Sequence, residues 1–190
     1  MPKFDVPNDI KVEDFFNNFV PEHFKKTVGA ADLSFLEGKE FTMQFDVDGK
    51  KFCLRIKGDK SLELIDGGIG KPMLWFQMTE DFWRESITEQ IDSGLDEFTE
   101  AERMADANRY NALLKTSGTL KAELDMPDGS VSRVNLVFNG GNAPEVTVKL
   151  ALEDWASMQR REVDGMNLVM GGKMQFEGDM PFLLELQQLL

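Results

Sequence analysis

Two Asp-Gly pairs constrain the fold of this chain most strongly, because each lies between stretches in which apolar and polar residues alternate. These pairs are Asp48-Gly49 and Asp128-Gly129. An Asp-Gly pair in that setting is among the strongest sequence signals for a tight β-hairpin. The sequence therefore predicts one hairpin within residues 40–58 and a second within 118–138. The residues expected on one face of the first hairpin are Phe41, Met43, Phe45 and Val47.

Three further strands are predicted from short apolar runs, at residues 61–65, 73–78 and 146–150. The segment between the first two, residues 66–71, is rich in glycine and ends in a lysine, as phosphate-binding loops do. Its glycines are too closely spaced, however, and Pro72 stands where such a loop needs Ser or Thr. We therefore interpret this segment as a plain turn.

Helical spacing of apolar residues predicts a helix over residues 12–28, with a new segment beginning at Pro21. Thr79 is expected to cap a second helix, because threonine at this position can accept a hydrogen bond from a backbone amide. A weaker apolar stripe predicts a half-buried helix over residues 95–115.

The chain closes on a strongly apolar helix, for which Asp179 is the expected cap and Pro181 suits the first turn. Its apolar residues are Phe182, Leu183, Leu186, Leu189 and Leu190. Five methionines lie in the same region of the chain: Met158, Met166, Met170, Met174 and Met180. Because a methionine side chain adapts to irregular apolar space, this pattern leaves open whether the space is a packed core or a ligand cavity.

A strand that runs into an acid, acid, aromatic sequence occurs twice. It precedes Glu80-Asp81-Phe82 and again Glu153-Asp154-Trp155. Alternating strands also resemble one another by chance, and the spacing between the matched segments is not constant. We predict a single domain over residues 1–190 and leave open whether it contains two degenerate half-repeats, about 36–117 and 118–190.

The formal net charge of −13 disfavours nucleic acid as a partner, because phosphate contacts need Lys or Arg. It also opposes lasting attachment to anionic membranes. No run approaches the roughly 18 apolar residues of a membrane-spanning helix, and the polar start lacks the apolar region of a signal peptide. With Cys53 as its single cysteine, the chain can form no internal disulfide, so we expect a cytoplasmic protein without stable membrane insertion.

The sequence offers few routes to catalysis. His23 is the sole histidine and lies in a predicted helix without a nucleophile motif, so we assign it no catalytic role. Asp46 and Asp48 begin like a calcium-binding loop, but the remaining ligands are missing. We expect no metal, no cofactor and no enzymatic activity.

The second half of the chain resembles the sterol carrier protein type 2 family. The resemblance lies in VTVKLALEDWASM as a strand leading into a helix, GMNLVMGGKMQFEGDM as a glycine-flanked strand, and PFLLELQQLL as the closing helix. It extends upstream through the hairpin of residues 120–138 and, more faintly, to the first half of the chain, with residues 90–116 as an insertion. Residues 139–144 are too short for the family's usual third strand, and the first half is extra.

The resemblance implies an α+β fold with a curved, largely antiparallel β-sheet, helices covering one face and a C-terminal amphipathic helix that closes the fold. It also implies an apolar tunnel for sterols, fatty acids or other lipids, and a function in binding without chemistry. By position in the pattern, the tunnel would be lined by Trp155, Met158, Met174, Phe176, Phe182, Leu183 and Leu186.

Our leading hypothesis is therefore non-catalytic binding or transfer of a hydrophobic small molecule. The polar groups that would select the ligand are not identifiable from the sequence, and neither is the oligomeric state. The alternative is an accessory protein-interaction module in which the same apolar residues fill an ordinary core, because a fold does not by itself fix a function.

Overall fold

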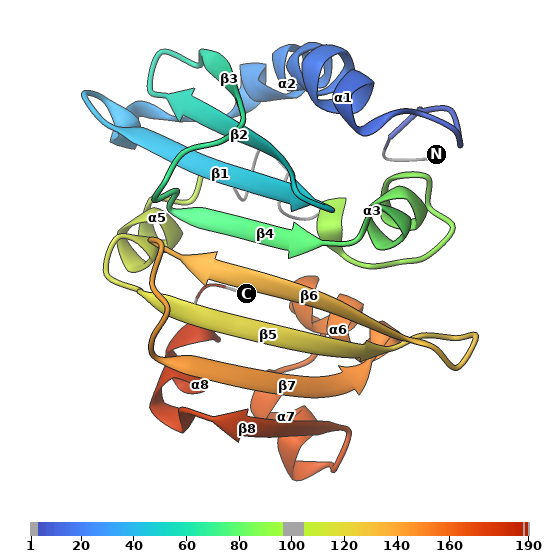
Figure 1. The fold of residues 1–190 in the computed structure, drawn as a ribbon. Coiled ribbons are helices and arrows are strands. Elements are labelled where there is room, and N and C mark those ends of the chain that lie inside the picture. The colour runs from blue at the N-terminus through green and yellow to red at the C-terminus, as the bar shows by residue number, and fades with distance from the viewer. Residues whose placement is uncertain (1–3, 97–104, 188, 190) are drawn as a thin grey trace.

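The computed structural model describes residues 4–96, 105–187 and 189, and its central feature is one eight-stranded sheet (Figure 1). The strand order is β3-β2-β1-β4-β6-β5-β7-β8. The strands are β1 Glu40–Val47, β2 Lys50–Lys57, β3 Leu62–Asp66, β4 Leu74–Met78, β5 Gly118–Asp125, β6 Val131–Phe138, β7 Glu145–Ala151 and β8 Met174–Gly178. Among the described strands, the β1–β4 and β5–β7 pairs are parallel and the others antiparallel, so the sheet is largely antiparallel.

Both predicted hairpins are confirmed, as the antiparallel pairs β1–β2 and β5–β6. In the first turn Asp48 and Gly49 both have positive φ, and the Asp46 carboxylate accepts a hydrogen bond from the Gly49 amide at 2.8 Å. The second connection is longer, because the Met126 amide pairs with the Ser130 carbonyl beyond the end of β5. Local turn chemistry thus sets the strand register in both halves.

The two halves of the sheet share a topology. In each, a hairpin is followed by a strand that pairs in parallel with the hairpin's first strand, β4 beside β1 and β7 beside β5. A helix follows directly, α3 (Glu80–Ile87) after β4 and α6 (Leu152–Gln159) after β7. In the C-terminal half, β8 pairs antiparallel with β7. In the N-terminal half, the strand that pairs antiparallel with β4 is β6, and this pairing joins the two halves of the sheet. The half-repeat remains a prediction, and this shared order supports it.

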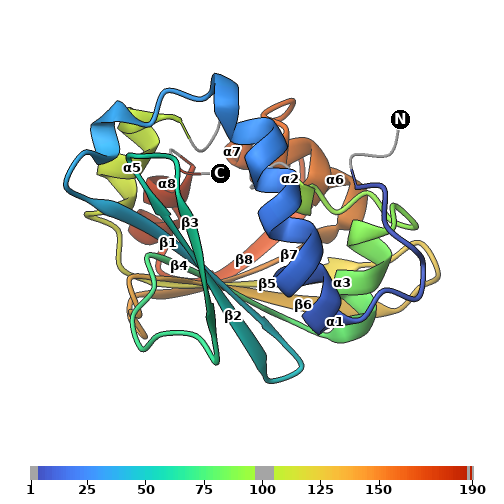
Figure 2. The same ribbon diagram turned by 90° about the horizontal axis from the view of Figure 1, so that it is seen from above.

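The helices cover one face of the sheet (Figure 2). The remaining helical elements are α1 Val12–Asp14, the π-helix η1 Phe15–Phe19, α2 Val20–Thr27, the short 3-10 helices η2 Val28–Ala30 and η3 Ser34–Leu36, α5 Ala107–Leu113, α7 Gly165–Met170 and α8 Met180–Leu186. The α+β fold inferred from the sequence is thereby confirmed. None of the helices in the described ranges has the length and apolar character needed to cross a bilayer.

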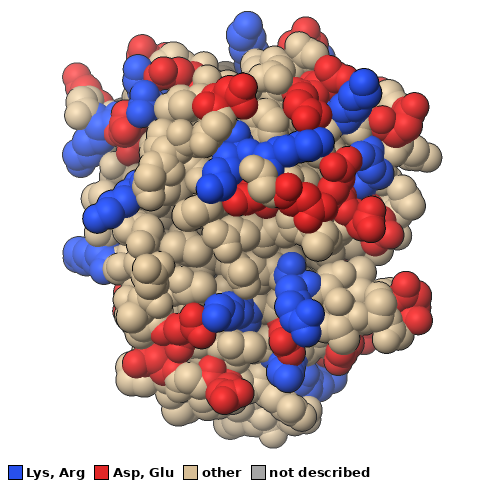
Figure 3. Space-filling view, viewed as in Figure 1, with Lys and Arg blue, Asp and Glu red and all other residues tan. Residues whose placement is uncertain are grey.

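The core lies between the helices and the strand residues that face them. Met43 and Phe45 of β1, Phe76 of β4 and Leu136 of β6 are nearly fully buried there. The opposite face carries cross-strand ion pairs, such as Lys121 to Glu145 at 2.8 Å. Figure 3 shows charged residues in the upper and lower parts of this face, with an uncharged band across its middle. One face therefore supplies the main core, and the other carries the charged residues.

The caps and breaks predicted for the helices are largely as expected. Thr79 accepts a hydrogen bond from the Phe82 amide at the start of α3, and α2 begins beside Pro21. The predicted helix over residues 95–115 is wrong in its extent, because α5 spans only Ala107–Leu113. It begins there because Asp106 accepts hydrogen bonds from the first amides of the helix. Residues 97–104 of the prediction lie outside the described residues.

The glycine-flanked strand predicted over residues 165–180 is wrong in its first part. Gly165–Met170 forms helix α7, and the strand β8 begins only at Met174. The Asp164 carboxylate accepts a hydrogen bond from the Met166 amide at 2.7 Å and so caps the helix. A short apolar run does not by itself distinguish helix from strand, and here the preceding aspartate decides.

Candidate functional site

The closing helix α8 begins as its sequence predicts. The Asp179 carboxylate accepts a hydrogen bond from the Phe182 amide at 2.8 Å, and Pro181 lies in the first turn. The helix buries Phe182, Leu183 and Leu186 against the sheet. This apolar face brings α8 over the C-terminal half of the sheet.

Beside α8 lies a pocket of about 500 Å³. It is bounded by the helix-covered face of β5, β7 and β8 and by α5, α8 and the connection between α6 and α7. Its apolar end is formed mainly by Leu120, Val148, Met158, Met174, Leu183 and Leu186. A pocket of this volume lies within the range usual for small-molecule sites, roughly 300–1,000 Å³.

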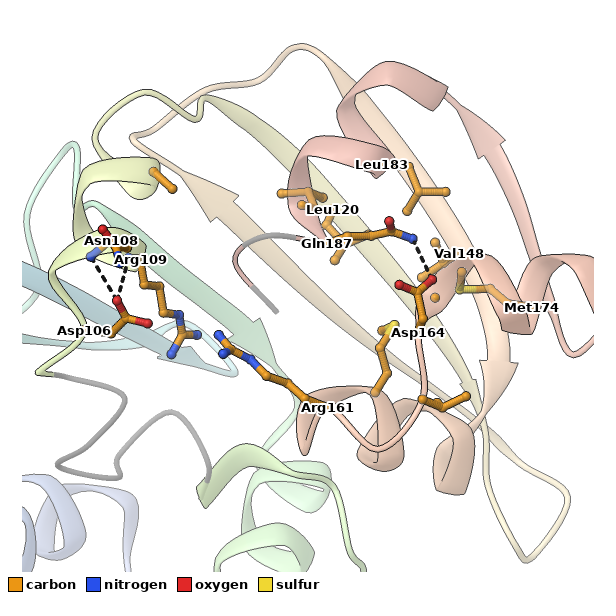
Figure 4. Close-up of a pocket in the computed structure, with 15 residues that line it drawn as sticks. Asp106, Asn108, Arg109, Leu120, Val148, Arg161, Asp164, Met174, Leu183 and Gln187 are labelled. Atoms are coloured by element: carbon orange, nitrogen blue, oxygen red, sulfur yellow. Dashed lines mark hydrogen bonds between the residues drawn. The ribbon is translucent and has the colours of Figure 1, made fainter.

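The other end of the pocket, here called the arginine end, is polar. Arg109 of α5 and Arg161 of the α6–α7 connection point toward one another across it (Figure 4). Arg109 is 9% exposed, so its side chain is held largely within the protein. Arg161 has a φ of 59°, and its amide donates to the Met158 carbonyl at 3.0 Å, which turns the chain after α6. The two guanidinium groups come from separate elements and share one space.

Two carboxylates at this site act as helix caps. Asp106 accepts hydrogen bonds from the Asn108 and Arg109 amides at 2.9 and 3.0 Å. Asp164 caps α7 through the Met166 amide, and its carboxylate also accepts a weak hydrogen bond from the Gln187 side chain at 3.5 Å. Carboxylates in such positions are stabilised by the positive end of the helix dipole. Asp106 therefore caps the helix that carries Arg109, whereas Figure 4 shows Asp164 on the other side of the pocket, near Val148 and Met174.

The structure brings four of the seven predicted ligand contacts to this pocket: Met158, Met174, Leu183 and Leu186. Three others are not among the residues that line it. Trp155 and Phe182 are almost fully buried, with the Phe182 ring edge-on to Phe138 at 6.2 Å, and Phe176 is partly buried on β8. Contact of all seven with a ligand remains a prediction.

Sequence reasoning missed the strand residues Leu120 and Val148 and both arginines. The alternation within β5 and β7 does place Leu120 and Val148 on the core face, so that signal was available. No comparable signal existed for Arg109 and Arg161, because their proximity depends on how α5 packs against the α6–α7 connection.

The sole histidine and cysteine lie on opposite sides of the sheet. His23 is on the helix side and lines a cavity together with Leu54 of β2. Cys53 precedes Leu54 on the same strand and therefore points to the other face. Burial raises the pKa of the Cys53 thiol to about 11, which keeps it protonated at neutral pH. These two residues therefore do not form a cysteine–histidine nucleophile.

Comparison with known proteins finds a family match for the C-terminal half of the chain. The model of the SCP-2 sterol transfer family matches residues 95–190, which include β5–β8 and α5–α8. No curated protein matches this chain.

Among solved structures, sterol carrier protein-2 like-3 from Aedes aegypti is 15% identical, with 53% of this chain and 93% of that chain covered and a TM-score of 0.36. Sterol carrier protein 2 from Yarrowia lipolytica is 14% identical, with 55% and 88% covered and a TM-score of 0.36. The sec-alkylsulfatase Pisa1 from Pseudomonas sp. is 13% identical, with 90% of this chain but 16% of that chain covered and a TM-score of 0.22. The assignment rests on the family model, and by that match the chain belongs to the SCP-2 sterol transfer family.

Proposed function

We propose that this protein binds a lipid with an acidic head group, such as a fatty acid, in the pocket beside α8. The observation that carries the proposal is the division of the pocket into an apolar end and an arginine end. An alkyl chain would lie against Leu120, Val148 and Leu183, and a carboxylate would lie between Arg109 and Arg161. Charge-assisted hydrogen bonds from guanidinium to carboxylate are the strong kind, and they add directional preference.

The driving force would be removal of the alkyl chain from water. Burial of about 300 Å² of apolar surface contributes about 7 kcal/mol at about 25 cal/mol per Å², before the cost of ordering the ligand. The arginine end adds selectivity, because guanidinium groups attract an anionic head group more strongly than a neutral one. Family membership supports the ligand class, and the pocket supports the mode of binding.

Exchange of the lipid requires an opening, and we propose that α8 provides it. The helix contributes Leu183 and Leu186 to the pocket wall, and Gln187, which follows it, also lines the pocket. An outward movement of α8 would expose the apolar end without disturbing the strands. We further propose action in a reducing compartment such as the cytoplasm, in keeping with the free, buried Cys53.

The alternative, a packed interaction module without a ligand, is less well supported. It calls for side chains that fill the space between α8 and the sheet, whereas about 500 Å³ lies beside Leu183 and Leu186. We therefore favour lipid binding as the function, without catalysis.

Replacement of Arg161 by Met is expected to weaken fatty-acid binding about tenfold, the loss of roughly one charge-assisted hydrogen bond. The measurement is displacement of a fluorescent fatty acid by oleic acid and, separately, by oleyl alcohol. Oleyl alcohol should compete equally well in the wild-type protein and in Arg161→Met, because it carries no charge.

Arg133→Met is the matched control, since Arg133 is exposed on the solvated face of β6 and far from the pocket. This control should bind both competitors as the wild type does. If Arg161→Met lost affinity for oleic acid and oleyl alcohol equally, Arg161 would affect binding only through the shape of the pocket. That result would contradict a role in head-group recognition. Absence of saturable fatty-acid binding to the wild type would contradict the proposed function itself.

A further inference from the structure

A second cavity lies in the N-terminal half, beneath the helical segment formed by α1, η1 and α2. Its volume is about 50 Å³. It is bounded by this segment on one side and by the core face of β1, β2 and β3 on the other. Figure 2 shows the same helical segment lying over the sheet. Residues on its two sides include Phe16, Phe19, His23, Phe45, Leu54 and Leu62.

This N-terminal cavity is separate from the pocket beside α8. The two sets of lining residues have no member in common, and the N-terminal cavity lies entirely before residue 95, where the family match begins. Each half of the sheet thus has a space between its core face and the helices above it. The second space is not explained by the function proposed for the first.

The chemistry of the N-terminal cavity is that of a hydrocarbon. None of the described residues that line it is charged, and the Thr27 hydroxyl already donates to the His23 carbonyl at 3.0 Å. The His23 imidazole stacks on the Phe19 ring at 5.4 Å, and partial burial lowers its pKa below the usual 6.5, so the ring is neutral at pH 7. Apolar cavities without polar partners stay dry, and they take up apolar guests.

The helical segment above the cavity is fixed at its ends and packed by rings in its middle. The Arg84 guanidinium donates to the Ile10 carbonyl before α1, and the Lys60 ammonium donates to the Gly29 carbonyl after α2 at 2.8 Å. Between these points, η1 places Phe16 flat on Phe52 with ring centroids 4.6 Å apart. A π-helical turn of this kind is rare and is frequently found at functional sites.

Rings held by dispersion can shift to admit a guest while the polar ties at both ends stay in place. A space lined by apolar groups offers water few hydrogen bonds, and an apolar guest would give the rings dispersion contacts that they lack when the space holds no guest. A volume of about 50 Å³ matches a small apolar group, and a larger guest requires the rings to move.

We propose that the N-terminal cavity is a second binding site, which takes an uncharged apolar group such as a small hydrocarbon or the end of an alkyl chain. The site does not depend on the lipid pocket beside α8. It differs from that pocket in rejecting charged head groups, because the described part of its lining has no charged group to pair with one.

The test uses xenon as the probe and methyl NMR of the full chain as the readout. Xenon should shift the methyl resonances of Leu54, Ile56 and Leu62 in a saturable manner. Leu62→Phe should reduce this response at least tenfold by filling the cavity, and the matched variant Leu183→Phe, in the other pocket, should leave it unchanged. Leu62 is only partly buried at the start of the edge strand β3, so the larger ring can be accommodated without loss of the fold.

A second measurement enlarges the cavity. Leu62→Ala should bind n-pentane about tenfold more tightly than the wild type, because roughly two more methylene groups can be buried. Fatty-acid binding at the pocket beside α8 should be the same in both Leu62 variants, which separates failure of this site from failure of the proposed function. Xenon shifts confined to Leu183 and its neighbours, or shifts at Leu54 that persist undiminished in Leu62→Phe, would overturn the proposal.

Discussion

Leu186→Asp is expected to lower the free energy of unfolding by about 4 kcal/mol, because it places an unpaired carboxylate where water is excluded. Leu186 is 0% exposed in the last turn of α8. A domain of ordinary stability has only about 5–15 kcal/mol in total, so the variant should be largely destabilised or unfolded. Denaturant unfolding followed by circular dichroism measures the effect.

Leu184→Asp is the control for this prediction, since Leu184 is in the same helix but 43% exposed. Its free energy of unfolding should stay within about 0.5 kcal/mol of the wild type. If Leu186→Asp instead unfolded at the same denaturant concentration as the wild type, Leu186 would not be packed against the sheet, and our description of α8 would be incorrect.

Gly118→Ala is expected to destabilise the protein by about 3 kcal/mol, through backbone strain and a clash that backbone atoms cannot relieve. Gly118 has a φ of +145°, and an added Cβ would lie 2.5 Å from the Pro144 carbonyl oxygen and 2.7 Å from Cζ of Phe182. That carbonyl is already fixed by the Thr119 amide at 2.9 Å. Because Phe182 belongs to α8, lipid affinity should fall together with stability.

Gly129→Ala separates the two causes of this effect. Gly129 also has a positive φ, of +85°, but its added Cβ would meet nothing within 4 Å. Gly129→Ala should therefore lower the free energy of unfolding by only about 1 kcal/mol, which is the backbone strain alone. Equal destabilisation by the two alanine variants in thermal or denaturant unfolding would show that the contact with Pro144 and Phe182 does not matter.

The elements that the sequence predicted well are those that local chemistry decides. Asp48-Gly49 specifies its turn through backbone conformations that most residues avoid, and Asp179 specifies the start of α8 through one hydrogen bond. Alternation in β1 and β5 identifies the buried face, because successive side chains point to opposite sides of a strand. These signals lie within a few residues of the structure they determine.

The order of the strands in the sheet could not be predicted from such local signals. The pairing of β4 with β6 joins residues from the two halves, such as Trp75 and Val137, and no local pattern specifies that neighbour. Helix α7 was misassigned because a short, mostly apolar segment fits the period of a helix and that of a strand. The opposed arginines were missed for a related reason, since a shared space between α5 and the α6–α7 connection exists only after the helices pack.

The central claim, that the pocket beside α8 holds a lipid, is tested most directly by native mass spectrometry of freshly purified protein. We predict a lipid adduct on the wild type and on Leu184→Trp, whose substitution is on the exposed side of α8, and its loss from Leu183→Trp, which fills the pocket. Added oleic acid should restore the adduct on stripped wild type but not on Leu183→Trp. No adduct on the wild type, before or after addition of micromolar oleic acid, would contradict the account.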